Sequence, residues 1–232
     1  SLNAPHHWNQ AFMVCIPEDT TEDQIQQAMV SLAEQHDMLR VSFVRSDDGI
    51  RQRYSDNTQS CIPLLKQLDT SALSNETLQK VLTQWQSDFE LFEGPLWQVG
   101  LLSGFNDGLA RVFFAAHHLI IDAVSWRIIA DDIKQLLTGN SLGQKTSSYR
   151  QWVNSINNYP EKHSDELNYW RAVTSNMTTY AAANEYSFHE VAFTKALTED
   201  LLHHANQGYH TEINDILLSA LAHTLAETFS TS

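Results

Sequence analysis

The spacing of apolar residues along the chain predicts alternating strands and helices. Short apolar or alternating runs, typical of β-strands, cover residues 10–16, 41–45, 50–54, 97–102, 109–116 and 188–194. Apolar positions at helical spacing cover residues 25–39, 73–92, 124–137, 147–156, 163–173, 198–205 and 211–229. Because strands and helices mix along the chain, the sequence predicts an α/β or α+β fold.

Capping and turn residues mark the ends of several of these elements. Thr20 and Thr21 precede an acidic pair, an arrangement that favours a helix start. The Asp-Asp-Gly turn at 47–49 joins its flanking runs as a hairpin. Pro160 separates two of the later helices, and the weakly patterned stretch 176–185 reads as a linker. We therefore predict a first domain over residues 1–175 and a second region over residues 176–232.

Charge and composition exclude several classes of partner. The 232 residues carry a net charge of −14 at neutral pH. Nucleic acids and anionic membrane surfaces require a basic face, so we expect neither as a partner. No apolar run approaches the roughly 20 residues of a membrane span, and the N-terminus does not resemble a signal peptide. Cys15 and Cys61 form no disulfide framework, and Cys15 is expected to be a buried free thiol. This composition predicts a cytoplasmic protein.

Two adjacent histidines at the end of the apolar run 109–116 are the strongest chemical signal. Side chains alternate across a strand, so His117 and His118 are expected to face opposite ways, one packed inward and one facing a cleft. An imidazole can remove and return a proton near neutral pH, which makes His118 the candidate general acid and base. A strand-end histidine satisfied by the backbone is the alternative, and the nearby Asp122 favours the catalytic interpretation.

Asp122, four residues after His118, has two interpretations. It could orient an imidazole, as in a catalytic triad. We favour the other role, in which it caps the following helix and fixes the loop by pairing with Arg40 or Arg127.

Three further side chains are candidates for the lining of a substrate pocket: Asn9, Ser125 and Trp126. The Ser125 hydroxyl could donate to a developing oxyanion. Trp126 begins a helix and is expected to pack rather than to stack on substrate.

The sequence predicts no metal site. Two adjacent strand residues cannot both face one ion, and no His-x-x-x-His pair or close cysteine pair is present. The doublets at 6–7 and 203–204 lie in polar stretches and are expected to be exposed. Glycine-rich phosphate loops and the Gly-x-Ser-x-Gly elbow are also absent, so Ser125 is not expected to be a nucleophile.

Four segments, in order, resemble motifs of one enzyme superfamily. Residues 117–127, His-His-Leu-Ile-Ile-Asp-Ala-Val-Ser-Trp-Arg, resemble the His-His-x-x-x-Asp-Gly core of the condensation-domain superfamily of nonribosomal peptide synthetases. Residues 35–40, Gln-His-Asp-Met-Leu-Arg, match a segment common to that superfamily, in which Arg40 is a supporting residue. Residues 5–10, Pro-His-His-Trp-Asn-Gln, and 211–221, Thr-Glu-Ile-Asn-Asp-Ile-Leu-Leu-Ser-Ala-Leu, resemble the epimerization subgroup in particular, as does the Val-Ser-Trp-Arg ending.

The resemblance implies a chloramphenicol-acetyltransferase-like fold, with residues 1–175 as the first of two subdomains around a tunnel and 176–232 as the start of the second. It implies that a carrier protein, with neighbouring synthetase modules, delivers substrate on a phosphopantetheine arm, and that no other cofactor is bound. It implies that His118 and a glutamate from a later Glu-Gly-His-Gly-Arg-Glu motif remove and return the α-proton of a thioester-bound amino acid.

The chain departs from this pattern at two points. Ala123 replaces the usual glycine, and the chain reaches Ser232 before any Glu-Gly-His-Gly-Arg-Glu motif. Glu212 belongs to an earlier motif and is not assigned the missing role. We therefore expect part of an epimerization domain. The alternatives are a condensation domain that forms peptide bonds and an inactive fragment that only docks a carrier.

Overall fold

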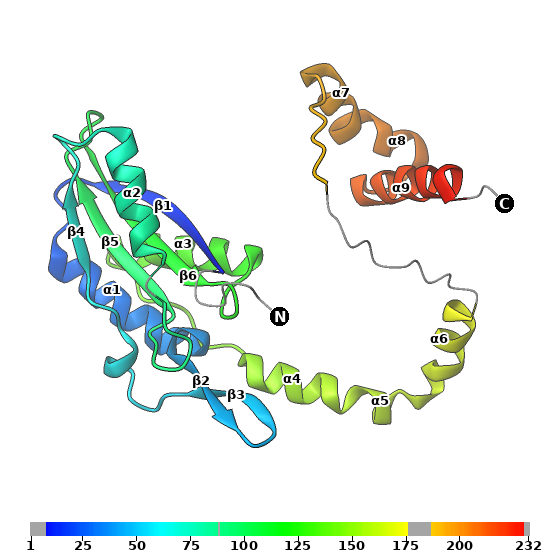
Figure 1. Cartoon of the computed structure of the whole chain (residues 1–232), viewed down its shortest axis with the longest axis horizontal. Helices are drawn as coiled ribbons and strands as arrows, with labels where there is room; N and C mark the ends of the chain where they lie inside the picture. The colour runs from blue at the N-terminus through cyan, green and yellow to red at the C-terminus, as the bar shows by residue number, and fades with distance from the viewer. Residues whose placement is uncertain (1–7, 88, 176–186, 230–232) are drawn as a thin grey trace. The chain divides into compact units, whose positions relative to one another are not determined.

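The computed structural model describes residues 8–87, 89–175 and 187–229 (Figure 1), apart from the side chains of residues 206 and 209. Contacts within the chain define two compact units, residues 1–167 and 168–232. This division comes earlier than the boundary after residue 175 that the sequence suggested. The linker expected at 176–185 and the doublet at 6–7 lie outside the described residues.

The first unit is built on a four-stranded sheet in the order β1-β6-β5-β4. The strands are β1 (Asn9–Pro17), β4 (Lys66–Asp69), β5 (Trp97–Ser103) and β6 (Leu109–His117). β6 pairs antiparallel with β1 and with β5, whereas β4 is parallel to β5. A separate hairpin joins β2 (Val41–Ser46) to β3 (Gly49–Tyr54). The strands predicted in this unit are confirmed, and β4 is an addition.

Helices cover both faces of the sheet (Figure 1). α1 (Glu22–Gln35) and α3 (Ala123–Leu137) pack on one face, and α2 (Asn75–Trp85) packs on the other. β6 serves both layers because its side chains alternate: Phe114 joins the core under α1 and α3, and Phe113 joins the core under α2. A strand buried on both faces has apolar residues at nearly every position, and residues 109–116 have them at every position except Arg111. Burial of each large apolar side chain contributes about 1.5–3 kcal/mol.

A capping side chain precedes the first residue of each of these three helices. Thr21 caps α1 and forms a reciprocal capping box with Gln24. Ser74 caps α2, and Asp122 caps α3. The prediction of a helix start after Thr21 is thus confirmed.

The helix predicted over residues 73–92 is too long, because α2 ends at Trp85. Phe89 and Leu91 are buried, but they reach the core from turns that precede Gly94. Gly94 has a φ of 65°, which favours glycine and ends any regular helix there. Apolar spacing in this stretch therefore reflects burial of a loop and not helix periodicity.

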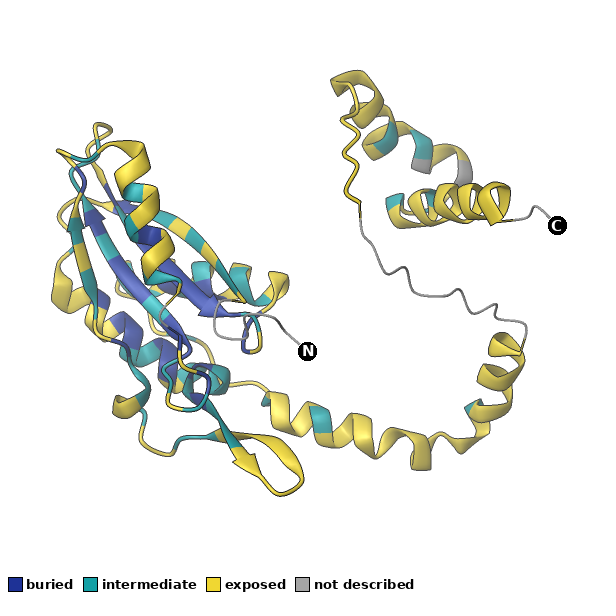
Figure 2. Ribbon diagram, in the orientation of Figure 1, coloured by how far each residue is buried: buried dark blue, intermediate teal, exposed yellow. Residues whose placement is uncertain are grey.

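Cys15 is exposed, so the prediction of a buried thiol is wrong. β1 is an edge strand, and its odd-numbered residues from Ala11 to Cys15 face a side of the sheet where they remain exposed, while Ile16 is buried. The pattern of buried residues over the sheet is visible in Figure 2.

The later segments are helices, and all but α9 are short. They are α4 (Tyr149–Asn157), α5 (Tyr159–Lys162) and α6 (Leu167–Thr174), followed by α7 (Lys195–Glu199), a π-helical segment (Asp200–His204), α8 (Ala205–Tyr209) and α9 (Ile213–Phe229). Pro160 was expected to separate two helices. It lies instead in the first turn of a further short helix, α5, where proline is tolerated. Among the described residues from Tyr149 onward, none is buried (Figure 2).

The strand predicted over residues 188–194 is wrong. The described residues 187–194 have no regular structure, and Phe188 is exposed. Alternation of side chains predicts a strand only where another strand supplies backbone partners, and none of the described strands pairs with this stretch.

Gly100 on β5 offers a stability test. A Cβ at this buried position would overlap the Trp85 ring of α2. We expect Gly100→Ala to lower the free energy of unfolding by about 1–3 kcal/mol, because overpacking forces the ring from its place. Urea unfolding followed by tryptophan fluorescence measures this. Gly143→Ala is the control, since no atom lies within 4 Å of its added Cβ, and equal effects at the two sites would contradict the prediction.

Candidate functional site

The two histidines at the end of β6 lie in different environments. His117 is fully buried, and its Nδ1 accepts a hydrogen bond from the Leu119 N–H at 3.1 Å. Its ring meets Phe89 edge-on, on the face of the sheet that α2 covers. His118 is half-buried and contacts residues of the opposite face. The structure thus agrees with the alternation predicted for this pair.

Both ring nitrogens of His118 have partners. Nδ1 lies 2.9 Å from the Ile121 carbonyl oxygen, and Nε2 lies 3.1 Å from the Gln10 side-chain nitrogen. A carbonyl oxygen only accepts, so Nδ1 carries the proton in the neutral ring. An amide nitrogen only donates, so the Nε2 lone pair accepts. These partners assign the tautomer of the neutral ring, with the proton on Nδ1 and the Nε2 lone pair accepting from Gln10.

Two tryptophans complete the surroundings of His118. The Trp8 ring lies 4.5 Å from the His118 ring, and the Trp8 carbonyl accepts the His118 backbone N–H at 2.8 Å. The Trp126 indole N–H donates to the Gln10 side-chain oxygen. Trp126 also meets the Phe12 ring at 4.8 Å, so it packs in the core as its position at the start of α3 indicated.

Asp122 caps α3. Its Oδ1 accepts the Ser125 backbone N–H at 2.8 Å and the Ser125 hydroxyl at 2.6 Å. These hydrogen bonds lower the pKa of Asp122 below its usual 3.8, and the nearby His118 lowers it slightly further. Ala123, where the family has glycine, begins the helix and has no positive φ, so its methyl group causes no strain there.

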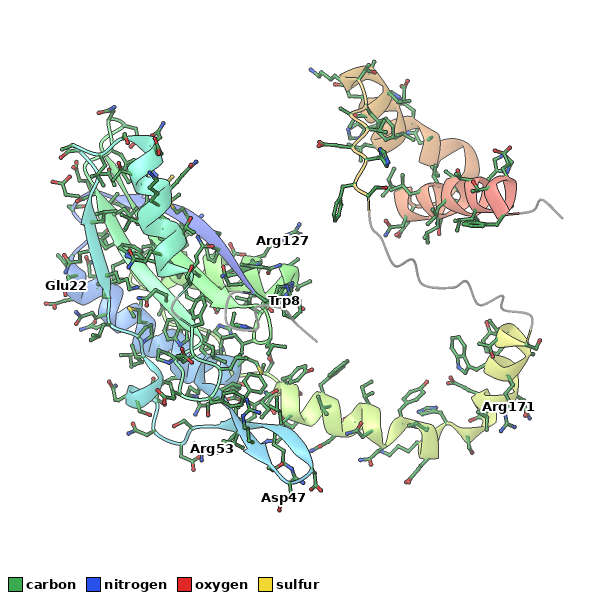
Figure 3. The ribbon with its side chains drawn as sticks, in the orientation of Figure 1. Trp8, Glu22, Asp47, Arg53, Arg127 and Arg171 are labelled. Carbon is green, nitrogen blue, oxygen red and sulfur yellow. The ribbon has the colours of Figure 1, made fainter. Side chains whose placement is uncertain are left out.

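The arginine partners expected for Asp122 do not bind it. Arg40 donates instead to the Asp37 carboxylate and, at 3.1 Å, to the Ser55 carbonyl. Arg127 is exposed on α3 and points away from the sheet (Figure 3). The prediction failed because Arg40 has a carboxylate three residues away on its own turn.

Asp122→Ala is expected to lower the free energy of unfolding by about 1 kcal/mol at neutral pH, the usual cost of a lost cap. The pKa of Asp122 is lower in the folded chain, so ionised Asp122 stabilises the fold above its unfolded pKa. The difference from wild type should shrink as the pH falls through the folded pKa. Urea unfolding at neutral and acid pH measures it. Asp122→Asn, which keeps a capping oxygen, should retain most of the stability, and an equal loss in both variants would contradict the capping role.

A cavity of about 200 Å³ lies beside the first turn of α3. Its polar lining includes Asp37, Lys145 and Ser125, and His118 is not part of it. Lys145 lies 2.5 Å from the Asp37 carboxylate. Burial raises the pKa of Asp37, but Lys145 and Arg40 outweigh it and hold that pKa below the usual value.

The three pocket candidates lie in three places. Ser125 lines the cavity, and its hydroxyl proton is engaged by Asp122. Trp126 donates to Gln10, which contacts His118. Asn9 pairs with His117 across β1 and β6, on the face away from His118, and donates to the Gln86 carbonyl at 2.8 Å. The structure therefore brings only Trp126 close to His118, through Gln10.

Gln10 and Trp8 contact His118 directly. Neither was predicted as a site residue from the sequence. Gln10 lies 108 positions from His118 in the chain, so no local pattern relates them. The signal that pointed to this segment is its motif, His-Trp-Asn-Gln. Figure 3 shows Trp8 at the start of β1.

Two other features, a metal site and a membrane-spanning helix, are not found among the described residues. In this part of the chain, no group of three or more histidine, cysteine or acidic side chains is arranged to hold a metal ion. Within the same residues, no helix has the length and apolar character needed to span a membrane. In the doublet at 203–204, both histidines are exposed, and His204 lies 2.9 Å from Asp200.

Comparison with curated proteins identifies large peptide synthetases as relatives. The condensation-domain family matches residues 1–231. An N-(5-amino-5-carboxypentanoyl)-L-cysteinyl-D-valine synthase of Amycolatopsis lactamdurans is 35% identical over 225 residues, which cover 95% of this chain and 6% of that protein. Tyrocidine synthase 2 of Brevibacillus parabrevis is 33% identical over 237 residues, which cover 93% of this chain and 6% of that protein. The chain thus spans a small part of these relatives.

Solved structures show the same fold. The epimerization domain from the third module of tyrocidine synthetase B matches with a TM-score of 0.79 and 28% identity, covering 99% of this chain and 56% of that one. The starter condensation domain of rhizomide synthetase matches in fold with a TM-score of 0.61 and 21% identity, covering 75% and 43%. The predicted chloramphenicol-acetyltransferase-like α/β fold is confirmed. The chain belongs to the condensation-domain family of nonribosomal peptide synthetases.

Proposed function

We propose that this chain is part of an epimerization domain, which inverts the α-carbon of an aminoacyl or peptidyl thioester held on a carrier protein. The observation that carries the proposal is the His118 ring, whose Nδ1 proton is engaged by Ile121 and whose Nε2 lone pair accepts from the Gln10 amide, a contact that a substrate can displace. A half-buried imidazole in this state is suited to remove a proton from a substrate that reaches it.

The comparisons support epimerization over other reactions of the family. The epimerization domain of tyrocidine synthetase B matches nearly the whole chain with a TM-score of 0.79. The name of the Amycolatopsis relative describes a product that contains D-valine. A synthetase with such a product needs a step that inverts an α-carbon or a source of the D-amino acid.

In the proposed reaction, the substrate displaces the Gln10 N–H from His118 Nε2, and Nε2 then takes the α-proton as the Cα–H bond breaks. The electron pair moves into the thioester carbonyl and gives a planar enolate. A proton delivered to the other face of this enolate reforms the Cα–H bond with inverted configuration. The thioester assists, because its α-proton is more acidic than that of an amide. One well-placed hydrogen-bond donor to the enolate oxygen would contribute about 10²–10³ in rate.

The partner groups of this reaction are also proposals. The substrate arrives on the phosphopantetheine arm of a carrier protein, next to other synthetase modules. Since the chain spans 56% of the solved epimerization domain, we assign the second proton-transfer group to the remaining part of such a domain. We propose no metal in the reaction, and His118 needs none to act as a base.

The test uses a complete domain that contains these 232 residues, with a carrier loaded with an L-amino acid, in deuterated water. We expect deuterium at the α-carbon and a mixture of L and D forms after hydrolysis of the thioester. The family match leaves condensation as the second candidate. A peptide formed from two loaded carriers, without α-exchange, would establish condensation and overturn epimerization.

A further inference from the structure

We propose that Gln10 is a positioning residue that selects the tautomer of His118 with its proton on Nδ1 and that Trp126 fixes the direction of the Gln10 amide. This inference deepens the proposed epimerization and rests on it, since it explains how the base of that reaction is held in one tautomer and one orientation. The three side chains come from β1, the end of β6 and α3, so the sheet and one helix hold the arrangement together.

The direction of the Gln10 amide is determined by Trp126. An indole N–H only donates, so the amide atom facing it must be the oxygen. The amide nitrogen then faces His118, where its N–H donates to Nε2 at 3.1 Å. A flipped amide would set two N–H donors against each other at Trp126. The packing of the Trp126 ring on Phe12 and Phe114 keeps the indole N–H in place.

The other side of the His118 ring is fixed by the backbone. Nδ1–H donates to the Ile121 carbonyl at 2.9 Å, and the Trp8 ring lies 4.5 Å from the imidazole. With a donor at Nε2 and an acceptor at Nδ1, a single neutral tautomer satisfies both contacts. The protonated ring would point an Nε2–H at the Gln10 amide hydrogens. Gln10 and Ile121 therefore fix one tautomer and one orientation of the ring, and the substrate must displace the Gln10 N–H before Nε2 can take the α-proton.

Charged groups near His118 are few among the described residues. Asp122, in the turn before α3, interacts with it through charge. The side chains of Trp8 and Gln10 on the β1 side and of Trp126 on α3 carry no charge, and Arg127 is exposed. The tautomer of the ring is thus decided by the two neutral groups that face its nitrogens, the Gln10 amide and the Ile121 carbonyl.

The first experiment follows the ring nitrogens of His118 by ¹⁵N NMR during a pH titration of the whole chain. We expect the wild-type neutral ring to carry its proton on Nδ1. In Gln10→Glu, a carboxylate accepts from both Trp126 and Nε2–H, so the protonated ring should persist to a pH about one unit higher. In Gln10→Met and Trp126→Phe, which keep most of the packing, the Nε2–H tautomer should gain population, because only the Ile121 carbonyl then favours the proton on Nδ1. Gln67→Glu, the same change on the exposed face of β4, should leave His118 as in wild type.

An Nε2–H tautomer in the wild-type chain, or a Gln10→Glu titration identical to wild type, would overturn the inference. Circular dichroism and tryptophan fluorescence establish that each variant is folded, and Gln10→Met decides the tautomer question should Gln10→Glu fail to fold.

The second experiment measures α-exchange in the complete domain. For Gln10→Glu we expect the pH of half-maximal exchange to rise by about one unit, with turnover at pH values well below the wild-type midpoint reduced about tenfold and KM unchanged. A loss of turnover at all pH values would indicate a merely structural role and overturn the inference. The two experiments separate the two proposals. If the wild-type domain shows no exchange, epimerization fails, and the NMR titration alone decides the role of Gln10.

Discussion

Replacement of His118 by alanine is expected to lower the rate of α-hydrogen exchange by about 10²–10⁴, the usual contribution of a positioned general base. The variant loses the hydrogen bonds of the ring to Ile121 and Gln10, but the ring is half-buried and lies beyond the last residue of β6. Its stability should therefore change little compared with its activity. Deuterium uptake at the α-carbon of a loaded L-amino acid, in a complete domain, measures the effect.

The matched control for this variant is His203→Ala, which changes an exposed imidazole in the second unit. It should exchange deuterium at the wild-type rate. Unchanged uptake in the His118 variant would remove this imidazole from the mechanism, whereas loss of uptake in both variants would point to a general effect on folding. His118→Gln adds a further check, since an amide can still bond to the Ile121 carbonyl but cannot act as a base.

The elements that face the core could be predicted from the sequence, and those defined by a distant partner could not. Residues 109–116 form an apolar run, interrupted only by Arg111, because β6 packs against helices on both faces. β4 has one apolar residue, Leu68, and is a strand because β5 supplies its hydrogen-bond partners. The reverse error occurs at 188–194, where the alternation is present but no described strand pairs with it.

The features of the candidate site also fall into those that the local sequence predicts and those that depend on a distant partner. The alternation of His117 and His118 and the capping role of Asp122 follow from local rules that connect close neighbours. The partner of His118 Nε2 does not, because the sheet brings Gln10 beside it from the other end of the unit. The contact of Arg40 with Asp37 was missed for a simpler reason. The sequence gives a list of carboxylates that could pair with an arginine, and only the fold of the turn decides among them.

His117→Ala is expected to lower the free energy of unfolding by about 3 kcal/mol. The ring is fully buried, so its removal leaves a cavity beside Phe89, and the Leu119 N–H loses its acceptor. A typical domain is stable by about 5–15 kcal/mol, so this is a large fraction of the total. Urea unfolding of the chain, followed through tryptophan fluorescence, measures it.

The comparison of the two histidines tests the assignment of their roles. His117→Asn offers an oxygen in place of Nδ1, so it should recover part of the stability that alanine loses. Exchange activity of a folded His117 variant should exceed that of His118→Ala, because His117 faces Phe89 on the far side of the sheet from Gln10. A His117→Ala chain as stable as wild type, with exchange abolished, would reverse the assignment and place the base on the α2 side of the sheet.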